Sequence, residues 1–197
     1  RMRILRSILA KDAEIRRNNA QSDLEVVTGG SGDDTLSGSG AINELNGGVG
    51  NDIINGLGGD DELNGESGND TLDGGAGNDD VNGGLDTDVI GGGSGNDTAS
   101  YAGRFEPVVV NLNGRAPDGA AGENDTIRSD VENAVGGLGN DTLTGSQGDN
   151  ELFGGDGSDT ISAQRGNDEL FGGAGADNLI GGRGNDTVNG GRGRDVI

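Results

Sequence analysis

An aspartate recurs at nine-residue intervals through most of this chain. Residues 65–82 show the unit most clearly, as GESGNDTLD followed by GGAGNDDVN, with Asp70 and Asp79 at the sixth position and Leu72 and Val81 at the eighth. The chain has no histidine and no cysteine. Its metal ligands are therefore limited to oxygen atoms, which suit hard cations such as Ca2+. Periodic carboxylates of this kind indicate metal binding rather than acid–base catalysis.

The nine-residue unit forms two arrays. The first array runs without a gap from Gly29 to Ser100 in eight units, and the second begins at Gly136 and reaches the eighth residue of its seventh unit at Ile197. Glycine at positions one, two and four lets the backbone take positive φ and turn tightly. Such a turn points carbonyl oxygens inward, beside the aspartate. The last three residues then form a very short strand whose aliphatic side chain faces in.

Two units make one coil, so equivalent turns stack with a period of eighteen residues and the aspartates fall into four columns. Neighbouring carboxylates in a column repel unless a cation lies between them. Calcium binds oxygens at about 2.3–2.6 Å, and it fits between coils that are about 4.8 Å apart. The predicted Ca2+ ligands are Asp34, Asp52, Asp70 and Asp88 in one column and Asp61, Asp79 and Asp97 in the next, and in the second array Asp141, Asp159, Asp177 and Asp195 in one column and Asp168 and Asp186 in the other.

Two units have asparagine at the sixth position, namely Asn43 and Asn150. The sites that they share with Asp61 and Asp168 lack one carboxylate, and the occupancy of these sites stays open. The same eighteen-residue period places Phe153 and Phe171 at equivalent positions. We expect their rings to stack on adjacent coils.

The composition indicates how such a chain becomes ordered. It has 197 residues, of which 44 are glycine and only four are aromatic, and its net charge is −22. Low apolar content with high net charge is typical of disorder, but the strict period argues against that interpretation. One buried aliphatic side chain per unit is too little to offset the entropy of ordering nine residues. We therefore predict that folding is coupled to metal binding and that the calcium-free chain is disordered.

Several classes of function are disfavoured. The strong negative charge argues against nucleic acid as a partner, because phosphates would be repelled. No run of about 18 apolar residues exists, so no transmembrane segment is expected. The chain carries no phosphate-binding loop and no nucleophile–histidine pair, so we expect no catalytic residue and no enzyme activity.

Residues 1–22 differ from the rest of the chain. Residues 1–20 hold six basic and two acidic side chains, with apolar residues at 4, 5, 8, 9 and 15. This spacing predicts a short basic amphipathic helix. Three interpretations of this segment are open. It is a helix that covers the open end of the solenoid, a helix that binds a surface or partner, or a disordered arm. Because the chain begins with Arg1 and stops within a repeat, we expect a processed product or a fragment of a longer protein.

Residues 101–135 interrupt the repeats. Val108–Leu112 predicts a short strand, and Asn124–Ile127 (NDTI) repeats the second half of the unit. The length of 35 residues is close to two coils of eighteen. We therefore expect degenerate linker coils that continue the solenoid between a first roll over 23–100 and a second over 136–197. The alternative is a hinge between two rolls.

This glycine–aspartate pattern, G-G-x-G-x-D-x-U-x with U aliphatic, resembles the RTX (repeats-in-toxin) nonapeptide repeats of haemolysin-type calcium-binding proteins. The resemblance covers residues 29–100 and 136–197. It implies an all-β fold, a right-handed parallel β-roll or solenoid, here with the short N-terminal helix added. It also implies one calcium ion between turn n and turn n+2, held by two aspartates and by turn carbonyls. It further implies type I secretion by a one-step exporter, with the chain unfolded in low cytosolic calcium and folding outside the cell.

Two functional hypotheses follow. The first is a secreted, extracellular calcium-binding structural repeat protein that folds on calcium outside the cell and self-assembles into a surface layer or filament, with itself or a cell-surface component as partner. The second is a calcium-folding export module of a larger secreted enzyme, toxin or adhesin. A catalytic or pore-forming domain encoded upstream of Arg1 would select the second.

Overall fold

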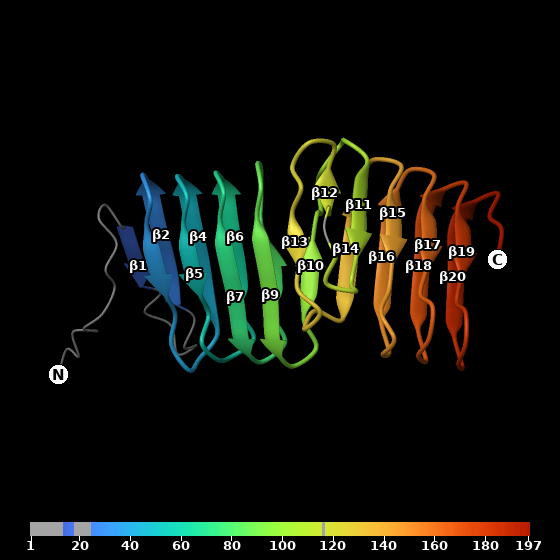
Figure 1. Cartoon of the computed structure of the whole chain (residues 1–197), viewed down its shortest axis with the longest axis horizontal. Coiled ribbons are helices and arrows are strands. Elements are labelled where there is room, and N and C mark those ends of the chain that lie inside the picture. The colour runs from blue at the N-terminus through green and yellow to red at the C-terminus, as the bar shows by residue number, and fades with distance from the viewer. Residues whose placement is uncertain (1–13, 18–24, 116) are drawn as a thin grey trace.

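The computed structural model describes residues 14–17, 25–115 and 117–197, and all of their strands belong to one stacked roll. The strands lie side by side along the long axis, with β1 and β2 at one end and β19 and β20 at the other (Figure 1). None of the described residues forms a helix, so no described helix is long and apolar enough to cross a bilayer. The predicted all-β solenoid is confirmed.

Three sheets build the roll. The long sheet has the order β1-β2-β4-β6-β8-β10-β14-β16-β18-β20, and two five-stranded sheets have the orders β13-β9-β7-β5-β3 and β12-β11-β15-β17-β19. The strands of the long sheet are β1 (Glu14–Arg17), β2 (Glu25–Ser31), β4 (Asn43–Val49), β6 (Glu62–Ser67), β8 (Asp80–Asn82), β10 (Thr98–Ser100), β14 (Asn133–Gly137), β16 (Glu151–Asp156), β18 (Glu169–Gly175) and β20 (Thr187–Gly193). The first short sheet contains β3 (Thr35–Ser37), β5 (Ile53–Asn55), β7 (Thr71–Ala76), β9 (Val89–Ser94) and β13 (Thr126–Ile127). The second contains β11 (Val108–Asn111), β12 (Gly119–Ala120), β15 (Thr142–Thr144), β17 (Thr160–Ser162) and β19 (Asn178–Ile180).

The strand register follows the nine-residue unit. In the long sheet Leu45 is the parallel partner of Leu63, and in the first short sheet Ile54 is the partner of Leu72. Each pair is eighteen residues apart, so two units make one coil, as the spacing predicted.

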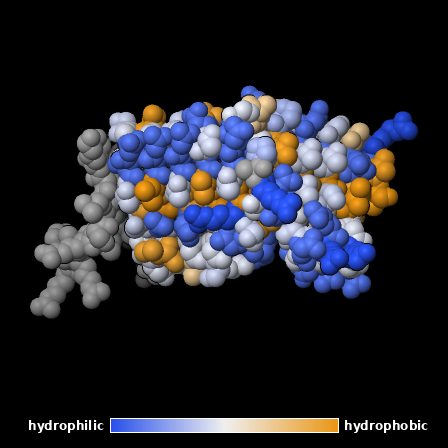
Figure 2. Space-filling model, in the orientation of Figure 1, coloured by the Kyte–Doolittle hydropathy of each residue, from blue (hydrophilic) through white to orange (hydrophobic). Residues whose placement is uncertain are grey.

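Two files of aliphatic side chains, one from each face of the coil, fill the roll in the arrays. The position-eight residues alternate between the two faces of the coil, and those from Leu36 to Leu179 are buried, with Val188 partly buried against them. The rings of Phe153 and Phe171 stack with centroids 4.6 Å apart and planes 6° apart, which confirms the predicted contact. Val49 and Phe105 are among the apolar side chains that reach the surface. On the face shown in Figure 2, hydrophobic residues lie among hydrophilic ones. The core of the arrays is narrow, with one aliphatic side chain from each face in every coil.

We call residues 101–135 the middle segment. It adds extra strands to the face opposite the long sheet, whereas the long sheet continues through it with a single step. Strand β10 pairs directly with β14, with Thr98 opposite Asn133. The 35 residues of the middle segment therefore advance the long sheet by one coil, whereas their length had suggested two coils. On the opposite face the segment supplies β13 to the first short sheet and β11 and β12 to the second. The long sheet is continuous across both arrays, while the other face divides into two sheets.

The helix predicted over residues 1–22 falls mostly outside the described residues. The four residues described there, Glu14–Arg17, form strand β1, which pairs antiparallel with β2. The helical prediction does not hold for these four residues. An end strand of a sheet presents open N–H and C=O groups, and a flanking segment can satisfy them by pairing. The spacing of apolar residues in this segment predicts helix but cannot report that β2 offers a strand edge with which the segment pairs.

Candidate metal centre

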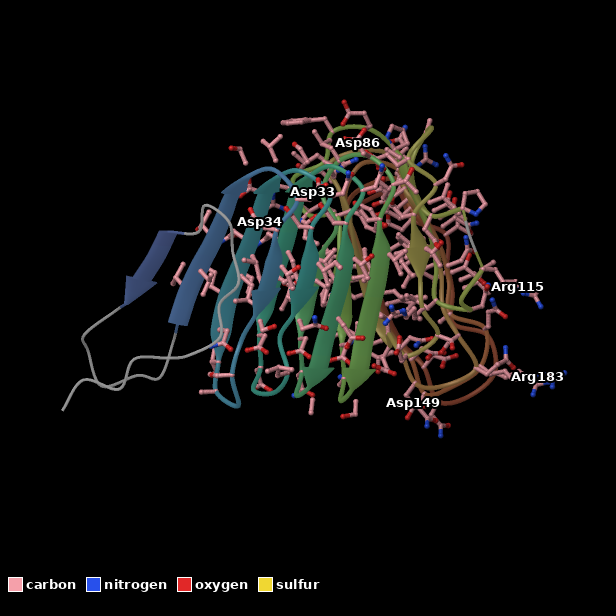
Figure 3. The ribbon with its side chains drawn as sticks, turned by 60° about the vertical axis from the view of Figure 1, so that its left-hand side comes forward. Asp33, Asp34, Asp86, Arg115, Asp149 and Arg183 are labelled. Atoms are coloured by element: carbon pink, nitrogen blue, oxygen red, sulfur yellow. The ribbon has the colours of Figure 1, made fainter. Side chains whose placement is uncertain are left out.

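The predicted aspartate ligands lie at the ends of the turns that connect the short strands. All of them are buried except Asp186 and Asp195, which are half-buried in the last coil. Figure 3 shows Asp34 at one edge of the roll, with Asp33 and Asp86 along the same edge. The structure therefore arranges the aspartates in columns, with one residue from each coil.

One carboxylate oxygen of a position-six aspartate ties two coils together. Asp52 Oδ1 accepts a hydrogen bond from the backbone N–H of Asp34 at 2.7 Å, and Asp70 Oδ1 accepts one from Asp52 at 2.7 Å. The same bond, across eighteen residues, recurs in the other columns, for example from Asp61 to Asp79 and from Asp141 to Asp159. Oδ1 is therefore used by the protein itself.

The second carboxylate oxygen is buried without a donor. This holds for the Oδ2 atoms of Asp52, Asp61, Asp70, Asp79, Asp88, Asp97, Asp159, Asp168 and Asp177. A buried charged oxygen that lacks a partner is costly. Its repetition in coil after coil indicates that a cation completes the structure.

A backbone carbonyl faces the same point as this oxygen. A Cβ atom built on Gly65 would collide with both Asp70 Oδ2 and the carbonyl oxygen of Gly83 in the next coil. A Cβ atom built on Gly47 would likewise collide with Asp52 Oδ2 and would lie 2.8 Å from the carbonyl oxygen of Gly65. A carboxylate oxygen and a backbone carbonyl oxygen therefore lie near one another in these turns, and both are ligand types that calcium prefers. The residues present fit a calcium ion beside these oxygens.

The glycines of the turn have two different roles. Positions two and four take positive φ, as at Gly48 (110°) and Gly50 (145°). Position one does not take positive φ, contrary to the expectation from sequence. Glycine is favoured there because a Cβ would collide with the aspartate Oδ2 and, in most units, with the carbonyl of the next coil, although Ala163 occupies this position in one unit. A few non-glycine residues occupy the positive-φ positions, namely Leu57, Glu66 and Gln164 at position two and Asp86 at position four.

The electrostatics agree with this assignment. Burial, together with the repulsion of neighbouring carboxylates, raises the pKa of Asp70 and Asp79 to about 6 and that of Asp88 to about 7. No cluster of three or more ligating side chains occurs among the described residues. A metal ion between turns must therefore take most of its ligands from backbone carbonyls.

The sequence comparison agrees with this geometry. The sequence model of the RTX calcium-binding nonapeptide repeat, which spans four copies, matches residues 28–63, 64–99, 126–161, 135–170 and 162–197. The chain belongs to the RTX calcium-binding nonapeptide repeat family. Among curated proteins, none matches the chain.

The RTX repeats carry a second ladder that sequence reasoning missed. At position five the backbone N–H of Asn69 donates to Asn51 Oδ1 at 2.8 Å, and that of Asn51 donates to Asp33 Oδ1 at 2.9 Å. These bonds run from the later coil to the earlier side chain, opposite in direction to those of position six. The recurrence of Asn and Asp at position five was the available signal. The ladder joins coils without a metal ion.

Asparagine at position six closes its own turn. Asn43 Oδ1 accepts from the backbone N–H of Ser39 at 2.6 Å, and Asn150 Oδ1 accepts from that of Ser146 at 2.7 Å. The oxygen that would face a cation in an aspartate unit is thus already hydrogen-bonded. The same closure occurs at Asp141, whose Oδ2 accepts from the backbone N–H of Gly137 at 2.6 Å.

The middle segment extends one aspartate column with protein donors. Asp125 Oδ1 accepts from the Asp88 backbone N–H at 2.9 Å, as in the RTX arrays, but Asp125 Oδ2 accepts from the Tyr101 hydroxyl at 2.9 Å. Nearby, Arg104 donates to the Gly84 carbonyl and forms an ion pair with Glu123. Asp125 was missed as a member of the column, although the NDTI motif carried the signal. Here a tyrosine and an arginine stand where the arrays would use a metal ion.

Proposed function

We propose that this chain is an extracellular calcium-binding structural module whose two RTX arrays fold when Ca2+ binds between successive turns. The thirteen aspartates predicted from sequence supply the side-chain ligands, and turn carbonyls supply the rest. The observation that carries the proposal is the repeated convergence of an unpartnered, buried Oδ2 with a carbonyl oxygen of the next coil. No catalytic residue is assigned.

Charge and core size support coupling between binding and folding. The net charge is −22, and the core is one aliphatic side chain per unit. Burying columns of carboxylates without a counter-ion opposes folding, because desolvation and mutual repulsion both disfavour the charged form. A ligand that binds only the folded chain shifts the equilibrium by mass action. Calcium is the natural ligand for this role, because the site offers only oxygen atoms.

The same coupling supports a location outside the cell. Membership of the RTX family favours export through a type I system, and a chain that stays unfolded in low calcium can be threaded through an exporter and fold in calcium-rich surroundings. We propose that the chain is secreted in this way. Two measurements test the proposed secretion. The first is the folding of the chain in low and in high calcium, and the second is its export by a type I system in a heterologous host.

Whether the chain acts alone or as the export module of a larger secreted protein is the second question. Self-association into a layer or filament is a prediction of the first hypothesis. Light scattering in millimolar calcium that shows growing particles supports it, whereas a monodisperse monomer counts against it. The complete open reading frame distinguishes the export module, because that role requires a further domain.

The central experiment is a calcium titration of the purified chain, followed by far-ultraviolet circular dichroism and by direct measurement of bound ions. We expect a disordered spectrum in chelator and a β spectrum in calcium, with several ions bound cooperatively. An identical β spectrum in chelator, with no ion bound in calcium, would falsify the proposal.

A further inference from the structure

Six asparagines of the chain are followed directly by glycine. They are Asn46, Asn55, Asn64, Asn82, Asn113 and Asn189. Such a pair is chemically labile, because glycine has no Cβ to shield its backbone nitrogen from the asparagine side chain. The nitrogen loses its proton and attacks the side-chain amide carbon Cγ, and the amide leaves as ammonia. Water then opens the succinimide ring at either carbonyl. The balance is asparagine plus water to aspartate or isoaspartate plus ammonia, without a metal ion or an enzyme.

Five of the six pairs belong to the arrays. In each of them the asparagine is at position nine and the glycine is the first residue of the next unit. Every one of these asparagines lies in a strand that pairs with a neighbouring coil, and every one of these glycines is buried. Asn55, for example, pairs with Ser37 and Asp73, and the Gly56 N–H donates to the Asp73 carbonyl at 2.9 Å. The repeat therefore holds its own labile pairs inside the sheets.

Ring closure is slow in this arrangement for two reasons. A buried backbone nitrogen is out of reach of the water or hydroxide that must take its proton. The backbone must also rotate out of the extended conformation to bring the nitrogen to Cγ, and pairing with the neighbouring coil opposes this rotation. At Asn46 a side-chain bond adds to the restraint, since Nδ2 donates to Glu44 Oε1 at 3.2 Å. An array pair can therefore react only when its coil opens.

The sixth pair lies in the middle segment, after strand β11. Asn113 and Gly114 are both exposed, and neither belongs to a strand. A Cβ atom built on Gly114 would come no closer than 3.4 Å to its nearest neighbour, Ser129, so the space around the pair is open. Figure 3 shows Arg115, the next residue, projecting at the outer edge of the molecule. Water and the rotation that ring closure requires are both available at this pair.

We propose that Asn113 is a deamidation site of the folded chain and that folding protects the other five Asn-Gly pairs. Selectivity for Asn113 depends only on the folded roll. The further step, that calcium switches the protection on, rests on the proposed function. The product adds a carboxylate to the open groove that Asn113 lines together with Arg115 and Glu132. The folded chain thus gains one negative charge at one position, whereas an unfolded chain is modified at six.

The test is peptide mapping by mass spectrometry after long incubation of the whole chain in mildly alkaline buffer. One sample is kept in saturating calcium and one in chelator, and circular dichroism records which of them is folded. In calcium we expect conversion at Asn113, and conversion at the five array pairs that is slower by about tenfold or more, because they react only through an opened coil. In chelator we expect all six pairs to convert.

Two variants serve as test and matched control. Asn113→Gln keeps an amide but requires a larger ring, so conversion at residue 113 in calcium should disappear. Asn64→Gln makes the same change at an array pair and should leave conversion at Asn113 as in the wild type.

The wild-type map alone decides the proposal. Conversion at Asn113 with protected array pairs in calcium supports it. A folded chain in which Asn113 keeps its amide, or in which the array pairs convert as fast as Asn113, overturns it. Array pairs that stay protected in chelator leave the Asn113 site standing and overturn the coupling of folding to calcium, and with it the proposed function.

Discussion

In the RTX arrays most buried aspartates, such as Asp70, present an Oδ2 atom that no protein group satisfies, and Asp141, whose Oδ2 accepts from the Gly137 N–H, is an exception. In the middle segment Asp125 Oδ2 accepts from Tyr101. The bond made by Oδ1 is the same in both regions, because the Oδ1 atoms of the array aspartates and of Asp125 accept a backbone N–H from the preceding coil. The regions differ in the source of the compensating charge. On the proposed function the arrays take that charge from a cation in solution, whereas one face of the middle segment carries its own donors. The repeat pattern is therefore required only where the metal binds.

The largest expected effect is the loss of an array carboxylate. Asp70→Asn removes a charge while an amide oxygen can still accept from the Asp52 N–H. We expect at least one calcium ion fewer and a loss of about 3 kcal/mol of stability in calcium, because a partner of a buried ion pair is removed. Calcium-dependent unfolding in urea measures this.

Asp60→Asn is the control for that variant. It removes the same charge at an exposed position-five site, where asparagine is common in other units. Equal losses in the two variants would show that overall charge, not ligation, decides stability.

The next effect belongs to the middle segment. Tyr101→Phe leaves Asp125 Oδ2 buried without a donor and should cost about 1–3 kcal/mol. The calcium count should stay the same, and the loss should not shrink as calcium is raised well above saturation. A loss that disappears at high calcium would mean that a metal ion replaces the hydroxyl, which would remove the distinction between the two regions.

Calcium affinity should depend on pH in the arrays. The folded pKa of Asp88 is about 7 and those of Asp70 and Asp79 are about 6, above the unfolded value of about 3.9. Because these pKa values are raised, the calcium-free roll is favoured below about pH 4 and loses that stability as the pH rises through 6 to 7. Calcium must displace the bound protons, so its affinity should increase from pH 5.5 to 7.5, by about tenfold per pH unit for each proton released. Titrations at the two pH values with proton release recorded measure it; equal affinities and no released protons would contradict it.

The smallest effect concerns the backbone of the turns. Glu66 occupies position two with φ of 74°, so Glu66→Gly should stabilise the calcium-bound roll by about 1 kcal/mol through relief of strain. Glu62→Gly, in strand β6, is the matched control and should destabilise it by about 0.5–1 kcal/mol. Thermal unfolding in saturating calcium compares the two, and destabilisation by both would show that position two does not require glycine geometry.

The periodic part of the structure could be predicted from the sequence, and the remainder could not. The coil of eighteen residues, the aspartate columns and the Phe153–Phe171 stack all follow from the repeat, because a fixed period sets the register of every strand. The Tyr101–Asp125 bond and the bond from the Asp97 N–H to Glu132 depend on pairing across segments 24 and 35 residues apart without a repeat. Strand β1 likewise arises from the open edge of β2, which local hydrophobic spacing does not encode.

A crystal structure of the chain grown in calcium, with anomalous scattering recorded from the metal, tests the central claim most directly. The account predicts peaks between successive array turns, each beside an aspartate Oδ2 such as those of Asp52 and Asp70, and none beside Asp125 Oδ2. An intact roll with no peak at the array turns would contradict it.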